Sequence, residues 1–229
     1  IPNPHDPDSV FVPPYLADTP ETRQDLALYY DEIGRMDGQI GQFIDELERR
    51  KIRENTLIIF LSDNGMPFPR AKGTLYDAGI RTPLIFSWPT QIEAGATFDG
   101  LASVIDLAPT LLELVGQTPP DEMQGRSIVS TLENPAETEG RDYVFSERNW
   151  HDADEHMRSL RTEDFKLIRN AYTELPHGTP ADIGNSPSWF SLLEQKERGD
   201  LTHAQSRLFE VPRPTIELYD LSTDPWEVH

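Results

Sequence analysis

Apolar residues recur at helical spacing over a long stretch near the start of the chain. Three or four positions separate successive members, which places them on one face of a helix. Asp18 or Thr19 is a suitable N-cap, and Pro20 fits the first helical turn. The basic residues 49–51 suit a helix C-terminus. The pattern therefore predicts one long helix whose apolar face consists of Leu26, Tyr29, Ile33, Met36, Ile40, Phe43 and Leu47.

Two uninterrupted apolar runs follow this helix, at residues 56–61 and 83–88. A β-branched and aromatic run of this length is typical of a strand buried on both faces, as in a parallel sheet. We expect both runs to be strands of one sheet. Residues 106–116 predict a short helix, with Asp106 as its cap and Gly116 as its stop, and residues 117–141 have the composition of a loop.

The pattern changes in the last third of the chain. Short strands are predicted there without a helix after each one, which indicates an antiparallel α+β unit. The sequence thus predicts an α/β fold, with residues 1–139 in a larger α/β domain and residues 140–229 in a small antiparallel subdomain. The predicted strands are residues 143–146, 157–161, 165–169 and 216–221, with a hairpin turn at 162–164 and a helix near 189–197.

Charge and composition exclude several classes of partner. The chain of 229 residues has 20 basic and 40 acidic residues, a net charge of −20. This balance opposes binding to nucleic acid and to anionic membranes. No apolar run is long enough to cross a membrane, so we expect no membrane insertion. Since cysteine is absent, disulfides and thiolate metal sites are excluded within this sequence.

Candidate chemistry begins where the first apolar run ends. Asp63 and Asn64 follow this run directly and offer two neighbouring oxygen ligands, which suit Ca²⁺ or Mg²⁺. Lys72 follows on a loop and could present a cation to an anionic substrate, with Arg70 as a nearby alternative. On spacing alone, an ordinary Asp-Asn-Gly turn is the commoner explanation, because such turns are frequent.

Four blocks of sequence together resemble the type I sulfatases of the alkaline-phosphatase superfamily. The blocks occur in the order of that family, and they span most of the chain. Residues 67–69, Pro-Phe-Pro, are similar to the N-sulfoglucosamine sulfohydrolase (heparan N-sulfatase) branch. The resemblance implies an alkaline-phosphatase-like fold, here part of a large mixed sheet flanked by helices, followed by the small antiparallel subdomain. The four blocks are residues 62–65, 72–84, 105–112 and 217–225.

The resemblance also implies roles for single residues. Asp63 and Asn64 correspond to ligands of one divalent cation, Ca²⁺ rather than Mg²⁺, and Lys72 to a cation that contacts the sulfate. We expect Tyr76 and Asp77 to shape this loop. The family hydrolyses sulfate esters or sulfamates with a formylglycine nucleophile. Its precursor motif, Cys or Ser followed by x-Pro-Ser-Arg, is absent from this sequence, as are the family's Asp-Asp pair and Lys-x-His.

Both ends of the sequence are interpreted as cuts, so the missing motifs are expected upstream of residue 1. His5 is not expected to be the catalytic histidine, because it falls on a connecting loop. The implied substrate is a sulfated sugar, and the implied location is secreted or periplasmic. Two alternatives stay open at this stage: a phosphodiesterase or phosphonate hydrolase of the same superfamily, and a non-catalytic homologue that only binds a glycan or a metal.

A second polar cluster lies at residues 151–158, His-Asp-Ala-Asp-Glu-His-Met-Arg. A transition-metal site is conceivable, because imidazole and carboxylate ligands suit Zn²⁺. A polar loop entering a strand is the commoner explanation. A third interpretation is a loop that reaches over the site and binds the sugar through His151, His156 and Arg158, since loops on rigid scaffolds often carry specificity.

Overall fold

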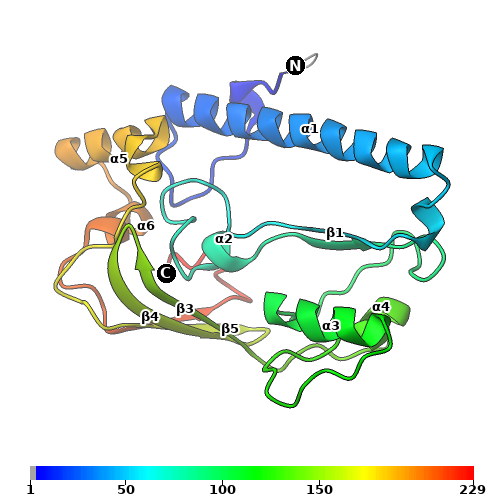
Figure 1. Cartoon of the computed structure of the whole chain (residues 1–229). Helices are drawn as coiled ribbons and strands as arrows, with labels where there is room; N and C mark the ends of the chain where they lie inside the picture. Colours follow the sequence, from blue (N-terminus) through cyan, green and yellow to red (C-terminus); the bar gives the residue numbers. More distant parts are fainter. Residues whose placement is uncertain (1–3) are drawn as a thin grey trace.

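A long helix lies along one side of the molecule (Figure 1). The computed structural model describes residues 4–229. Helix α1 (Pro20–Arg49) begins as predicted: Thr19 Oγ1 accepts a hydrogen bond from Thr22 N–H at 3.2 Å, and proline occupies the first turn. Only the start of its apolar face is covered. Leu26 is fully buried, whereas Phe43, near the other end, is 73% exposed.

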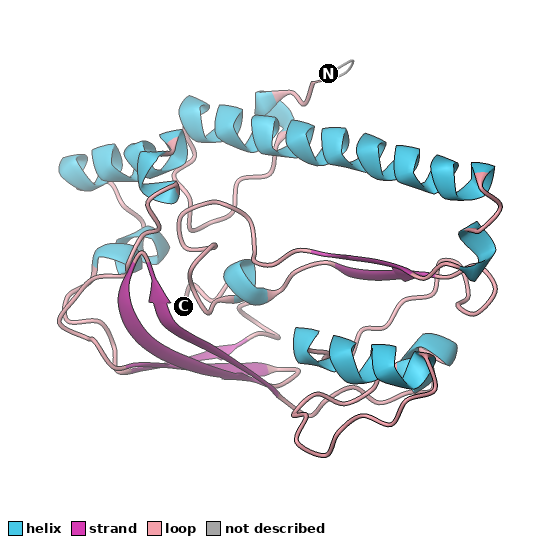
Figure 2. Cartoon of the chain, viewed as in Figure 1, coloured by secondary structure: helices cyan, strands magenta, loops and turns pink. Residues whose placement is uncertain are grey.

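Two short strands beneath α1 form an antiparallel ribbon (Figures 1 and 2). Strand β1 (Ile58–Leu61) pairs with β2 (Leu84–Ser87), with Ile58 opposite Ser87. The prediction of a fully buried strand in a parallel sheet is therefore wrong within the described residues. An apolar run identifies a strand but not its neighbour, and no crossover helix of sufficient length separates these two strands. The intervening segment contains only the four-residue helix α2 (Asp77–Ile80).

The region after β2 carries three short helices. The predicted helix at 106–116 is a 3₁₀ turn, η3 (Val104–Asp106), followed by α3 (Leu107–Leu114). Asp106 caps this region differently from the prediction, since its carboxylate accepts from Ser103 N–H in a capping box one turn earlier. The expected loop at 117–141 also contains helix α4 (Val129–Glu133), which the sequence analysis missed.

A four-stranded antiparallel sheet forms the lower left of Figure 1. Its strands follow one another in the order of the chain. The predicted hairpin around 162–164 is confirmed, but β3 and β4 are longer than expected. Within residues 151–158 only Asp152, at the hairpin turn, lies outside β3 and β4, so the interpretation of residues 151–156 as a loop entering a strand is wrong. The strands are β3 (Val144–His151), β4 (Ala153–Arg161), β5 (Phe165–Asn170) and β6 (Ile216–Asp220).

Helix α5 (Pro187–Arg198) confirms the helix predicted near 189–197, and it packs against α1. Ser186 caps its start, and Gly199, with a φ of 75°, ends it in the left-handed region that glycine tolerates. Helix α6 (His203–Ser206) follows. The remaining 3₁₀ helices are η1 (Pro7–Ser9), η2 (Arg53–Asn55), η4 (Ile183–Asn185) and η5 (Arg207–Phe209).

The hydrophobic core joins the two predicted domains. Each of three buried clusters combines residues from before and after position 139. In the first, Leu26 of α1 lies in the same cluster as Val228 near the C-terminus. The division at residue 139 stays a prediction. Among residues 4–229, no helix is both long and apolar enough to cross a membrane.

Candidate functional site around Lys72

The segment that carries Lys72 lies against one face of the four-stranded sheet. Tyr76 is buried in a cluster with Met157, Ile168 and Tyr219, whose side chains come from three strands. Alternate residues of a strand point to opposite faces, so these three define the inner face of the sheet. Because the strands are paired along their length, this face gives the loop a rigid support.

Buried charges fix the loop just after Tyr76. Lys166 of β5 is fully buried, and its Nζ donates to Leu75 O at 3.1 Å and to the Asp77 carboxylate. Asp77 also pairs with Arg161 at 3.2 Å. Burial acts to raise the pKa of Asp77, but the Lys166 and Arg161 cations outweigh it, and the pKa is lowered. These contacts confirm that Tyr76 and Asp77 shape the loop.

The structure distinguishes Lys72 from its alternative, Arg70. The Arg70 guanidinium is buried, lies 3.7 Å from the centroid of the Tyr76 ring, and donates to Trp226 O at 3.0 Å and to Glu227 O. Arg70 therefore holds the C-terminal segment in place. The Lys72 side chain is 23% exposed, and its Nζ lies 2.6 Å from Asp182 Oδ2. Of the two cations, Lys72 is the one accessible to a ligand.

Asp63 and Asn64 lie on a tight turn that is tied to the Lys72 loop. Asn64 Nδ2 donates to Gly65 O at 2.7 Å, which leaves its amide oxygen available. Gly65 N–H donates to Gly79 O at 2.8 Å, and Lys72 N–H donates to Met66 O at 3.1 Å. The backbone thus brings the strand end and the lysine loop together.

Glycine is required at position 65 because the backbone of α2 approaches it closely. A Cβ atom added there would lie 1.8 Å from Ala78 O, a distance that no side chain can occupy. This close approach lets the chain turn directly after Asp63 and Asn64. The turn therefore packs α2 against the end of the strand, and Asp63 and Asn64 lie on this same turn.

Asp63 and Asn64 offer the type of ligand that a hard cation binds, but too few ligands to complete its coordination. An exposed carboxylate and a free amide oxygen are the ligands that Ca²⁺ takes, yet Ca²⁺ requires six to eight oxygen ligands. Within residues 4–229, no group of three or more His, Asp or Glu side chains is arranged to hold a metal. The pair fits part of a coordination shell.

The three predicted sugar-binding residues occupy different faces of the sheet. Arg158 pairs with Glu147 at 3.2 Å on the outer face, opposite to Met157 and the Lys72 loop. His156 lies on that same face, near Tyr172. Only His151 is brought close to the Lys72 region, because its carbonyl accepts from Arg148 at 3.2 Å, and Arg148 also donates to Gly73 O. Their binding roles stay predictions.

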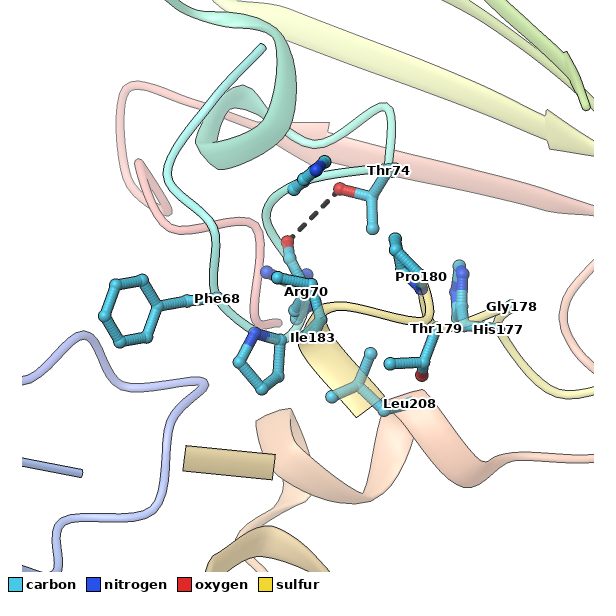
Figure 3. Close-up of a pocket in the computed structure, with 11 residues that line it drawn as sticks. Phe68, Arg70, Thr74, His177, Gly178, Thr179, Pro180, Ile183 and Leu208 are labelled. Atoms are coloured by element: carbon cyan, nitrogen blue, oxygen red, sulfur yellow. Dashed lines mark hydrogen bonds between the residues drawn. The ribbon is translucent and has the colours of Figure 1, made fainter. Parts of the chain in front are cut away.

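A small pocket beside Lys72 is formed by the loop at 68–74 and the segment at 177–183 (Figure 3). His177 lines it and was missed in the sequence analysis. Its Nε2 lies 3.3 Å from Tyr76 Oη, and its Nδ1 lies 3.4 Å from Arg213 Nη1. Burial, helped by the nearby Arg213 cation, lowers the pKa of His177 to about 3. The imidazole is therefore neutral near pH 7.

Asp182 and Arg148 were also missed, and local sequence gave no signal for either. Asp182 stands in a Gly- and Pro-containing segment, and Arg148 in a strand of alternating character. Each acquires its place through a contact with a residue far away in the chain. Arg148, for example, reaches Gly73 across a separation of 75 positions.

Comparisons with known proteins identify the family of this chain. The sulfatase family model matches residues 2–117, and the model described as N-sulphoglucosamine sulphohydrolase, C-terminal, matches residues 70–206. The chain therefore belongs to the sulfatase family. Its fold is the alkaline-phosphatase-like fold of that family. A putative sulfatase from Bacteroides fragilis superposes with a TM-score of 0.63 at 21% identity, over 91% of this chain and 38% of the other.

Two curated relatives are more similar in sequence. Human N-sulphoglucosamine sulphohydrolase is 34% identical over 239 residues, which covers 99% of this chain and 47% of the human protein. An ulvan-active sulfatase of Formosa agariphila is 36% identical over 219 residues, which covers 95% of this chain and 36% of that protein. The chain thus spans about a third to a half of the length of these relatives.

Proposed function

We propose that the protein to which this chain belongs hydrolyses sulfate from a sulfated glycan, and that its substrate carries N-sulfoglucosamine. The observation that carries the proposal is the accessible Lys72 ammonium on a rigid loop tied to the turn of Asp63 and Asn64. The similarity to human N-sulphoglucosamine sulphohydrolase over nearly the whole chain supports the choice of sugar. A secreted or periplasmic location belongs to the same proposal.

Lys72 is the residue of this chain that would contact the transferred group. Its ammonium would neutralise charge that develops on the sulfate oxygens, a kind of stabilisation that is strong in a partly desolvated site. Asp63 and Asn64 would hold Ca²⁺, which supplies Lewis-acid polarisation when bound. The formylglycine nucleophile is proposed to lie outside these 229 residues. His151 is proposed to line the sugar side of the site.

The test uses the full-length protein with two sugars, N-sulfoglucosamine and glucosamine 6-O-sulfate, and a phosphonate monoester as the third substrate. We expect sulfate release, measured by ion chromatography, to be fastest from the N-sulfated sugar. Lys72→Ala and Asp63→Ala should each lower kcat/KM by roughly 10²- to 10³-fold. Lys51→Ala, an exposed lysine beyond the end of α1, serves as the control.

Two results would overturn parts of this proposal. Turnover of the phosphonate without sulfate release would assign a different reaction. Near-normal activity of both Lys72→Ala and Asp63→Ala would show that the active site does not include these residues. Calcium is tested separately by metal analysis, in which the Asp63→Ala protein should retain less bound Ca²⁺ than the unaltered protein.

A further inference from the structure

Lys72 has one side-chain partner, and it comes from a distant part of the chain. Lys72 Nζ lies 2.6 Å from Asp182 Oδ2, across a separation of 110 positions. Within residues 4–229, this is the only hydrogen bond of the ammonium group. A lysine side chain has a flexible four-carbon stem and three rotatable donors, so its direction is set by what it binds. Asp182 therefore determines where the ammonium points.

Asp182 is itself held firmly, although its side chain is 52% exposed. Its other oxygen, Oδ1, accepts from Ile183 N–H at 3.0 Å, at the start of η4. The segment around it is tied down by two further hydrogen bonds: Gly184 N–H donates to Pro180 O at 2.8 Å, and Asn185 Nδ2 donates to Ala181 O at 2.7 Å. One carboxylate oxygen thus anchors the residue, and the other is presented to Lys72.

The β3–β4 hairpin joins the two sides of this ion pair. Arg148 donates to Gly73 O, next to Lys72, and to Gly178 O at 3.4 Å, at the start of the Asp182 segment. At the tip of the same hairpin, Asp152 Oδ2 accepts from Ala181 N–H at 2.8 Å. The lysine loop and the aspartate segment are therefore held in one fixed relation.

We propose that Asp182 is a positioning residue that directs the Lys72 ammonium toward the sulfate group of the substrate. The inference rests on the proposed function. One N–H of the ammonium binds Asp182, and two N–H groups remain for the sulfate oxygens. The carboxylate does not attract an anion, so its contribution is geometric: it keeps a flexible cation in the orientation that the transferred group requires.

An inhibitory role of Asp182 predicts a different result. If Asp182 only blocked Lys72 and had to leave before substrate bound, its removal would raise kcat/KM. If it directs Lys72, removal lowers kcat/KM, because misplacement of a catalytic group by about 1 Å costs on the order of 10²-fold in rate. Asp182→Asn keeps an oxygen that accepts from the ammonium, so this variant should recover most of the activity.

The experiment measures sulfate release by the full-length protein with Asp182→Ala, Asp182→Asn, Lys72→Ala, and Lys72→Ala combined with Asp182→Ala. We expect Asp182→Ala to lower kcat/KM by roughly 10- to 100-fold, and Asp182→Asn to stay within a few-fold of the unaltered protein. In the Lys72→Ala background, Asp182→Ala should have no further effect, since it acts through the lysine. Asp200→Ala, an exposed carboxylate after α5, is the matched control.

A second measurement separates this inference from the proposed function. The affinity for inorganic sulfate is measured by calorimetry in the same variants, and it should fall in Asp182→Ala only when Lys72 is present. If no sugar is turned over but this pattern holds, the proposed function fails and the positioning role stands. If turnover occurs and Asp182→Ala equals or exceeds the unaltered protein, the positioning role is overturned. If Asp182→Ala lowers kcat/KM equally with Lys72 present and in the Lys72→Ala variant, Asp182 has only a structural role, and the positioning role is again overturned.

Discussion

Replacement of Lys166 by methionine should be among the most destabilising single changes in the chain. Lys166 is fully buried; its Nζ donates to Leu75 O and to the Asp77 carboxylate, and it forms an ion pair with Glu227 Oε1 at 3.0 Å. Methionine has a similar length but no charge, so the variant leaves two buried carboxylates without their shared cation. Burial already raises the pKa of Glu227, and the nearby Asp77 charge acts in the same direction.

The expected loss follows from that stranded charge. Removing one partner of a buried ion pair costs about 3–5 kcal/mol, because the remaining charge stays desolvated and unpaired. At about 2 °C per kcal/mol, the low end of the range for larger domains, this loss lowers Tm by roughly 6–10 °C. Arg161 still pairs with Asp77, so Glu227 is the carboxylate that bears most of the penalty.

The assay is thermal unfolding of the full-length protein, followed by circular dichroism. Lys51→Met is the control, since this exposed lysine should change stability by no more than about 0.5 kcal/mol. Combining Lys166→Met with Glu227→Gln removes the stranded charge and should recover part of the loss. A Tm for Lys166→Met within about 2 °C of the unaltered protein would refute the reasoning, and so would a double variant less stable than the single one.

Three further predictions concern pH, an ion pair and a turn. The pKa of His177 is lowered to about 3, so His177 does not reduce the free energy of unfolding above pH 6.5, where the imidazole is neutral in both the folded and the unfolded state. As the pH is lowered from 6.5 to 3, only the unfolded state binds the extra proton, so the free energy of unfolding falls by up to about 1.4 kcal/mol per pH unit. His177→Gln should make this pH dependence smaller, as measured by urea unfolding at several pH values. Asp106→Ala should cost about 3–5 kcal/mol in urea unfolding, since it leaves Arg141 without its buried partner; a loss under about 1 kcal/mol would contradict this. Gly65→Ala should lower Tm and Ca²⁺ retention together, because the added Cβ meets Ala78 O, and an unchanged protein would show that the turn adapts.

Elements with local signals were predictable from the sequence. The cap at Thr19, the proline after it and the helical spacing of apolar residues all lie within α1 itself. The hairpin around 162–164 is equally local. The antiparallel pairing of β1 with β2 was not predictable, because an apolar run gives no information about the strand that lies beside it. The polar composition of residues 151–158 was misleading for a related reason: polar residues also occupy a strand that has one face turned to solvent, as β4 has.

The candidate site also combines residues that local sequence could predict with one that it could not. Lys72, Asp63 and Asn64 lie on one short segment with a recognisable pattern. Asp182 is separated from Lys72 by 110 positions and is brought beside it by the tertiary fold. No periodicity or motif marks such a residue. Its signal is a tertiary contact, which a single sequence does not contain.

The inner face of the four-stranded sheet also sets an order of events during protein synthesis. The Lys72 loop leaves the ribosome before Tyr219, which supports Tyr76 and belongs to strand β6. At roughly 5–20 residues per second, the interval between them lasts on the order of ten seconds. The loop that is proposed to bind sulfate therefore acquires its support only near the end of translation of this region, and nascent chains that stop before β6 leave that loop unsupported.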